Sequence, residues 1–143
     1  MPAMIWIVAA AVVVYLARNL FLRLRSDSVA ALVDRRRATS RLVTRGEYVD
    51  GNRHVDVALA LTPSTLFYEN SDMQASLDLQ WVREVEYTTE LATGARIESG
   101  EVLRLRSDRQ TFEFVIPEDA VAGWRAVVPP RGRADVTPAA VPA

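Results

Sequence analysis

An apolar run opens the chain, and the pattern of apolar positions changes twice after it. Residues 3–17 (AMIWIVAAAVVVYLA) carry no charged side chain, and apolar residues continue past Arg18 as far as Leu24. A helix over residues 3–24 would be about 33 Å long, enough to cross the ~30 Å hydrocarbon core of a bilayer. The run therefore predicts a transmembrane anchor helix within residues 1–25.

Aromatic and basic residues near this run indicate how the helix would sit. Trp6 and Tyr15 are spaced to reach the two membrane interfaces, where amphipathic rings are favoured. Arginine is abundant only after the run, which predicts an outside N-terminus and a cytoplasmic C-terminal domain at a bacterial inner membrane. The arginines expected at the interface are Arg18, Arg23, Arg25, Arg35, Arg36 and Arg37.

Three other interpretations of the run fit less well. A cleaved signal peptide needs a basic segment before it and a small-residue cleavage site after it, and neither is present. A buried helix of a soluble core would not carry the arginine run at 35–37. An interfacial amphipathic helix needs a polar face, which residues 3–17 lack.

Residues 26–45 form a basic juxtamembrane segment. Val29, Leu32 and Val33 make a narrow apolar stripe of helical spacing after serines that can cap a helix. The segment is either a solvated linker or a helix resting on headgroups or on a partner subunit. Whether it continues the membrane helix stays open.

From residue 46 the period of apolar positions becomes two, which predicts strands. Residues 55–62 (VDVALALT) show this alternation most plainly, after the hairpin signal Asp50-Gly51. A short helical turn at 81–84 and a long loop at 92–100 interrupt the pattern. Further apolar segments of this kind lie at 66–68, 77–79, 82–87, 102–105 and 112–116. Short strands with polar turns between them predict an antiparallel barrel or sandwich over residues 46–128.

The end of this unit has a helical pattern. Pro117 and two acidic residues suit a helix start, and Val121, Trp124 and Val128 then fall on one face, predicted to pack on the barrel. The remaining residues 129–143 are rich in proline and alanine and cannot bury a core, so by themselves they are predicted to be disordered.

The charge is divided along the chain. Residues 1–46 hold eight arginines against two aspartates, a balance of +6, whereas residues 47–128 hold seven arginines against fifteen acids, a balance of −8. An acidic domain repels nucleic acid and gains nothing from lying on anionic lipid. All basic residues are arginine, which we interpret as GC-rich coding, and cysteine is absent, which excludes disulfides and thiolate chemistry.

Three segments give the chain a family likeness: residues 59–70 (LALTPSTLFYEN), 75–87 (ASLDLQWVREVEY) and 102–124 (VLRLRSDRQTFEFVIPEDAVAGW). With a final helix that bears a tryptophan, they resemble the pleckstrin-homology (PH) superfold in its GRAM-like and bacterial PH-like variants. The resemblance implies a seven-stranded antiparallel barrel or sandwich over residues 45–128, capped by a C-terminal helix through Trp124.

The resemblance also implies a choice of ligand. Such domains bind phosphoinositide headgroups through basic residues of the first hairpin, or bind peptides and proteins. Here that hairpin, residues 50–54 (DGNRH), offers one constant cation beside an acid, which is a poor phosphate cradle. Protein binding suits the acidic domain better.

No catalytic, cofactor or metal-binding residues are predicted. His54 could pair with Asp56 on one strand face, with Ser64 or Thr65 as nucleophile, but a surface histidine is the commoner arrangement. The sequence favours a non-catalytic, single-pass accessory subunit of a larger integral membrane complex, for example a respiratory or photosynthetic one. Its expected partners are the bilayer and other membrane subunits, with no nucleic acid and no small-molecule substrate. The alternatives are a free membrane-tethered lipid-binding or signalling adaptor and, more remotely, a His54 hydrolase.

Overall fold

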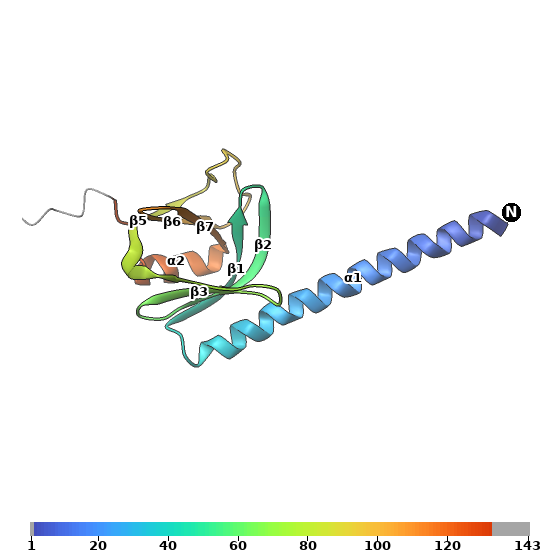
Figure 1. The fold of residues 1–143 in the computed structure, drawn as a ribbon, viewed down its shortest axis with the longest axis horizontal. Helices are drawn as coiled ribbons and strands as arrows, with labels where there is room; N and C mark the ends of the chain where they lie inside the picture. The colour runs from blue at the N-terminus through green and yellow to red at the C-terminus, as the bar shows by residue number, and fades with distance from the viewer. Residues whose placement is uncertain (1, 133–143) are drawn as a thin grey trace, which may run out of the picture.

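A computed structural model describes residues 2–132, without the side chains of residues 2–6 and 26. One long helix, α1 (Pro2–Arg37), projects from a seven-stranded antiparallel sheet that curls into a half-barrel around a second helix, α2 (Glu118–Val127) (Figure 1). The predicted order of an apolar N-terminal helix, a mainly β unit and a C-terminal helix is confirmed.

The seven strands form one continuous sheet in the order β4-β3-β2-β1-β7-β6-β5. β4 and β5 are its two edges, so the barrel is open along one side. A 3₁₀ turn, η1 (Leu79–Trp81), links these edges a little earlier in the chain than the helical turn predicted at 81–84. The strands are β1 (Leu42–Asp50), β2 (Arg53–Leu61), β3 (Thr65–Glu69), β4 (Gln74–Asp78), β5 (Val82–Thr88), β6 (Glu101–Ser107) and β7 (Thr111–Ile116).

β1 is the strand at which the sheet turns. It pairs with β2 along its whole length but with β7 only at residues 47–49. Just before that second pairing, a Cβ atom on Gly46 would lie 2.7 Å from both Leu59 Cδ1 and the Val115 carbonyl oxygen. Only glycine lets the three strands approach this closely.

The core lies in the concavity of the curled sheet. Alternate residues of the strands point into it. Four of its rings, Tyr48, Tyr68, Phe112 and Phe114, pack in tilted or edge-to-face pairs with centroids 5.0–6.5 Å apart. α2 lies across the core, as the final amphipathic pattern predicts, and the Trp124 side chain is fully buried there.

Boundaries differ from the sequence pattern in two places. The hairpin at Asp50-Gly51 is confirmed, with Gly51 at φ 59°, but β1 already begins at Leu42, inside the segment assigned to a linker or helix. At the other end Pro129–Gly132 are described and Arg131 pairs with β5. The prediction for the rest of the tail, 133–143, lies outside the described residues.

Candidate functional site

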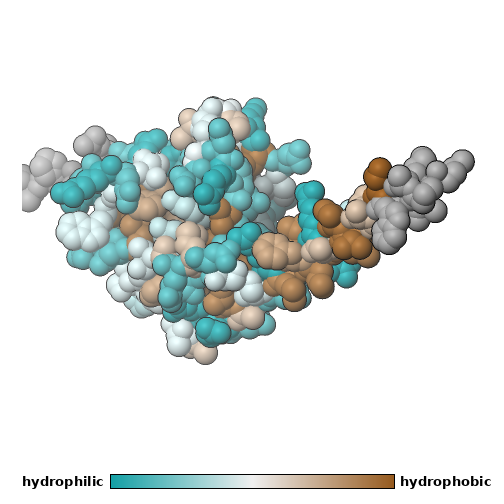
Figure 2. Space-filling model, turned by 45° about the vertical axis from the view of Figure 1, so that its right-hand side comes forward, coloured by the Kyte–Doolittle hydropathy of each residue, from teal (hydrophilic) through white to brown (hydrophobic). Residues whose placement is uncertain are grey.

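The N-terminal half of α1 is an exposed apolar rod. From Ile7 to Leu24 no residue of the helix is buried by the rest of the chain, and this stretch is about 27 Å long. Its large apolar side chains remain between 50% and 69% exposed, whereas the face of the β unit seen in Figure 2 is mostly hydrophilic. By length and composition this helix could cross a membrane.

α1 runs without a break through residues 26–37, so this part of the segment left open by the sequence continues the apolar helix. Along this continuous helix the residues predicted to lie at the membrane interface fall into two groups that are far apart. Tyr15, Arg18 and Arg23 are exposed on the projecting half, and the side chain of Trp6 lies outside those described. Arg36 lies about 18 Å beyond Leu24 along the helix axis, more than the ~10 Å Debye length. Of these three arginines Arg36 binds the β unit and Arg37 pairs with Asp34 of α1 at 3.6 Å, and their place at the membrane interface stays a prediction.

The last turns of α1 pack on the outer face of the sheet. Val29 and Val33 are buried against Ala58 of β2. The small side chain of Ala58 allows close approach of the helix, while its neighbours Val57 and Leu59 point into the barrel core. This half of β2 is thus buried on both faces, by the core on one side and by α1 on the other.

Ion pairs hold the helix on both sides of this apolar contact. Arg36 pairs with Glu69 at the end of β3, which is 4% exposed, and its guanidinium lies 4.3 Å from the centroid of the Phe67 ring. Nearer the apolar rod, Arg25 pairs with Asp72 in the β3–β4 turn. A buried carboxylate with a stacked arginine partner is a specific contact, because arginine combines a planar charge with an apolar face.

Asn70 fixes the turn that receives Arg25. Its Oδ1 accepts hydrogen bonds of 2.8 Å from the backbone N–H groups of Asp72 and Met73, and its Nδ2 donates to the Asp56 carbonyl at 3.0 Å. Asn70 is 8% exposed and ties β3 to β2 at the point where α1 leaves the sheet. Hydrogen bonds within the sheet thus hold in place the turn that binds Arg25.

A shallow groove of about 450 Å³ lies between α1 and the β1–β2 hairpin. It is lined by Leu22, Arg25, Glu47, Arg53, His54, Val55, Asp56 and Asn70. His54 Nδ1 lies 2.9 Å from Glu47 Oε2, so its partner is Glu47 and not Asp56, which pairs with Arg45.

The predicted hydrolase residues are not brought together. Ser64 and Thr65 lie past the far end of β2, and seven residues, about 23 Å along the strand, separate His54 from that end. Over residues 2–132 no three His, Asp or Glu side chains gather in a way that could hold a metal ion.

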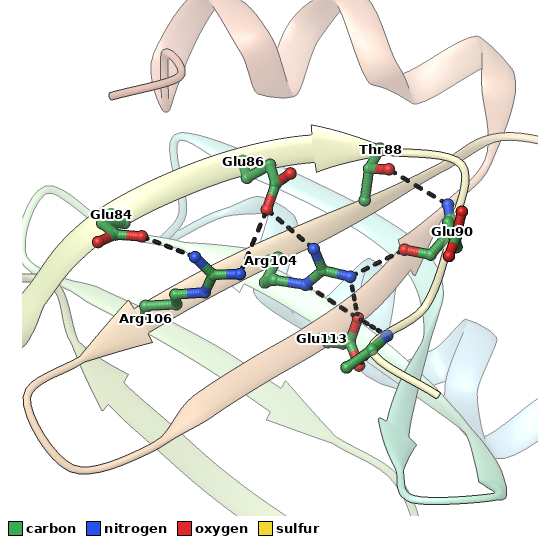
Figure 3. A network of polar contacts seen from close by, with 8 residues as sticks. Glu84, Glu86, Thr88, Glu90, Arg104, Arg106 and Glu113 are labelled. Carbon is green, nitrogen blue, oxygen red and sulfur yellow. Dashed lines mark hydrogen bonds and ion pairs between the residues drawn. The ribbon is translucent and has the colours of Figure 1, made fainter. Parts of the chain in front are cut away.

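A second polar feature covers the outer face of β5, β6 and β7 (Figure 3). Arg104 donates to Glu113 at 3.0 Å, to Glu86 at 2.9 Å and to the Glu90 carbonyl at 2.8 Å. Burial disfavours the charge of Arg104, but these carboxylates outweigh it and raise its pKa. Glu113 also accepts from the Ala92 N–H, so the network fastens the loop after β5 onto the sheet.

The predicted packing residues of α2 lie in the barrel core. Trp124 is fully buried, with Val121 and Val128 partly buried around it. Tyr87 of β5 donates a hydrogen bond of 2.7 Å to the Val128 carbonyl at the end of α2. Burial raises the pKa of Tyr87 to about 12; nearby Arg125 lowers it and Glu101 raises it.

Sequence reasoning found the apolar rod and the α2 face but missed the contact between α1 and the sheet. One signal for it was available: residues 57–61 (VALAL) carry no polar side chain at any position, which is typical of a strand buried on both faces. Comparisons with protein families, with curated proteins and with solved structures find no match to this chain.

Proposed function

We propose that this chain is a non-catalytic, single-pass accessory subunit of a larger integral membrane complex. In this role residues 3–24 of α1 cross the bilayer and contact neighbouring membrane helices. The β unit then makes protein contacts on the cytoplasmic side of a bacterial inner membrane. The arginines that follow the apolar stretch support that orientation.

The observation that carries this proposal is the rigid connection between anchor and sheet. A tether for a freely moving domain needs only a flexible linker, but here one uninterrupted helix leads from the apolar rod into a contact made of Val29, Val33 and the Arg36–Glu69 pair. Such a connection fixes the direction in which the β unit faces. A fixed direction is useful when the partner is also held in the membrane.

We also propose that the β unit is PH-like, as its sequence segments suggest. A strand order in which β1 joins a four-stranded half to a three-stranded half supports this relationship. So does a final helix that places Trp124 in the core.

The subunit proposal is tested by purification of the tagged full chain from its native membrane in mild detergent. We expect defined membrane proteins to copurify. They should be lost when residues 1–24 are replaced by an unrelated apolar helix, a change that leaves Arg25 and the sheet contact in place. The proposal fails if the native chain migrates alone on native gels in every mild detergent.

A membrane-tethered adaptor that binds anionic headgroups is the second candidate. It is favoured by Arg53 in the groove beside α1, an exposed cation near the end of the apolar rod. Full chain reconstituted in nanodiscs should then protect the hairpin from hydrogen exchange only with anionic lipid, and Arg53→Glu should abolish that protection. Equal exchange in neutral and anionic nanodiscs would remove this candidate.

A further inference from the structure

The free edge of β5 already accepts a short piece of the C-terminal chain. Arg131 and Val85 exchange two backbone hydrogen bonds, of 2.9 and 3.0 Å, in an antiparallel bridge. The Arg131 guanidinium also donates to the Val82 carbonyl at 2.7 Å. Pro129 and Pro130 have no backbone N–H to donate. Arg131 is therefore the first residue of this segment that can both donate and accept a backbone hydrogen bond.

The antiparallel direction leads from this bridge toward an apolar groove. Residues beyond Gly132 that followed the edge would pass Arg83 and reach η1, where Trp81 is 56% exposed. Beside Trp81 lies a groove of about 510 Å³. It is lined by Leu77, Trp81, Ser107, Asp108, Arg109, Gln110 and Phe112.

We propose that residues 133–143 of this same chain bind in the groove beside Trp81. The segment starts from the pairing already seen at Arg131, next to the irregularity of β5 between Val82 and Glu84. Eleven extended residues reach about 36 Å, which is ample to cross the groove. The inference is independent of the anchor's role in a membrane complex.

The chemistry of the segment fits this surface. Residues 136–142 (VTPAAVP) offer small apolar side chains and two prolines, and grooves lined by aromatic rings bind extended proline-containing segments. The groove is thus a site for an extended proline-containing strand, supplied by its own chain.

Tryptophan fluorescence of the full chain in detergent micelles tests the proposal. All variants carry Trp6→Phe, so that among the three tryptophans only Trp81 and the fully buried Trp124 emit. We expect the chain ending at Gly132 to show red-shifted emission and stronger acrylamide quenching than the full chain. Val136→Asp with Val141→Asp, which keeps the tail length, should behave like the shortened chain.

Two controls identify the groove as the place of binding. With Trp81→Phe added, the difference between the long and short chains should vanish, and a difference that persists would contradict the proposal. A peptide of residues 133–143 added to the shortened chain should restore protection of Trp81. Equal emission and quenching in full and shortened chains would overturn the proposal and leave the groove to a segment of another protein.

Discussion

Glu113 joins two parts of the molecule through one carboxylate, because it accepts hydrogen bonds from Arg104 and from the Ala92 N–H. The side chains of Arg104 and Glu113 are 11% and 10% exposed, so removal of either charge leaves the other poorly solvated. Such a pair is costly to break from one side, even where it adds little net stability.

Glu113→Gln is therefore expected to lower the free energy of unfolding by about 3 kcal/mol, the low end of the usual range because Glu86 still pairs with Arg104. Chemical denaturation measures the change. The matched control is Asp108→Asn, which breaks the exposed Arg83–Asp108 pair and should cost about 0–1 kcal/mol. Equal costs for the two variants would show that the buried network has no special role.

The raised pKa of Tyr87 predicts that the folded chain loses stability at alkaline pH. Its pKa rises from 10.0 to about 12 in the folded chain, so folding favours the protonated phenol. The stabilisation is complete below pH 10 and is lost as the pH rises toward 12. Unfolding free energies measured across this range should fall more steeply for the native chain than for Tyr87→Phe. Parallel curves would contradict the assignment, since Tyr48 and Tyr68, whose pKa values burial also raises, are present in both.

At the scale of elements, β2 is buried on both faces where α1 lies against it. Ala58 is 1% exposed beneath Val29 and Val33, so a larger side chain must push the helix away. Ala58→Leu should destabilise the contact by about 1–3 kcal/mol and speed tryptic cleavage at residues 35–37. Ala30→Leu, on the exposed side of α1, adds the same side chain and should leave cleavage unchanged. Equal cleavage of the two variants would mean that α1 does not depend on this contact.

Two glycines are expected to respond in opposite ways. Gly46→Ala places a Cβ 2.7 Å from a backbone oxygen of β7, which cannot move aside, and should destabilise the sheet by about 1–3 kcal/mol. Gly123→Ala on α2 meets only Leu42 Cδ1 at 3.6 Å and should stabilise by about 0.5–1 kcal/mol through helix propensity. Thermal unfolding of the two variants measures both, and a stabilised Gly46→Ala would contradict the sharp turn of the sheet at β1.

Local patterns predicted the elements well, because apolar spacing, turn glycines and the acidic start of α2 act within a few residues. They did not predict how elements meet. Arg36 and its partner Glu69 are 33 residues apart, and nothing near either residue distinguishes a buried pair from two solvated charges. The burial of Arg104 was likewise not predictable. This arginine alternates regularly with core residues on β6, a pattern typical of any outward-facing strand residue.

At the scale of the whole molecule, the basic and acidic parts of the sequence contact each other. The basic half of the chain does not stand apart from the acidic half, because Arg25 and Arg36 bind Asp72 and Glu69 of the sheet. Opposite charges in the two segments therefore contribute to holding the β unit on α1. Within the proposed membrane subunit, Arg18 and Arg23 remain as the arginines beside the apolar stretch.

Helix insertions test whether the direction of the β unit matters. Two alanines after Leu24 rotate the β unit by about 200° relative to the apolar rod, whereas four rotate it by about 40° and add about 6 Å. If the subunit proposal holds, the two-residue insertion should abolish copurification and the four-residue insertion should largely retain it. The β unit itself should unfold at the same temperature in both. Equal copurification would mean that the anchor acts only as a tether.

The continuity of α1 also has a mechanical side. The helix has 36 residues and is about 54 Å long, with no break where the apolar stretch ends. Such a rod is a lever: each 10° of tilt at one end displaces the other by about 9 Å. Transmembrane helices tilt to match the thickness of the bilayer around them. If α1 spans the bilayer as proposed, a lipid environment that altered this tilt would swing the whole β unit sideways, without disturbing a single contact inside it.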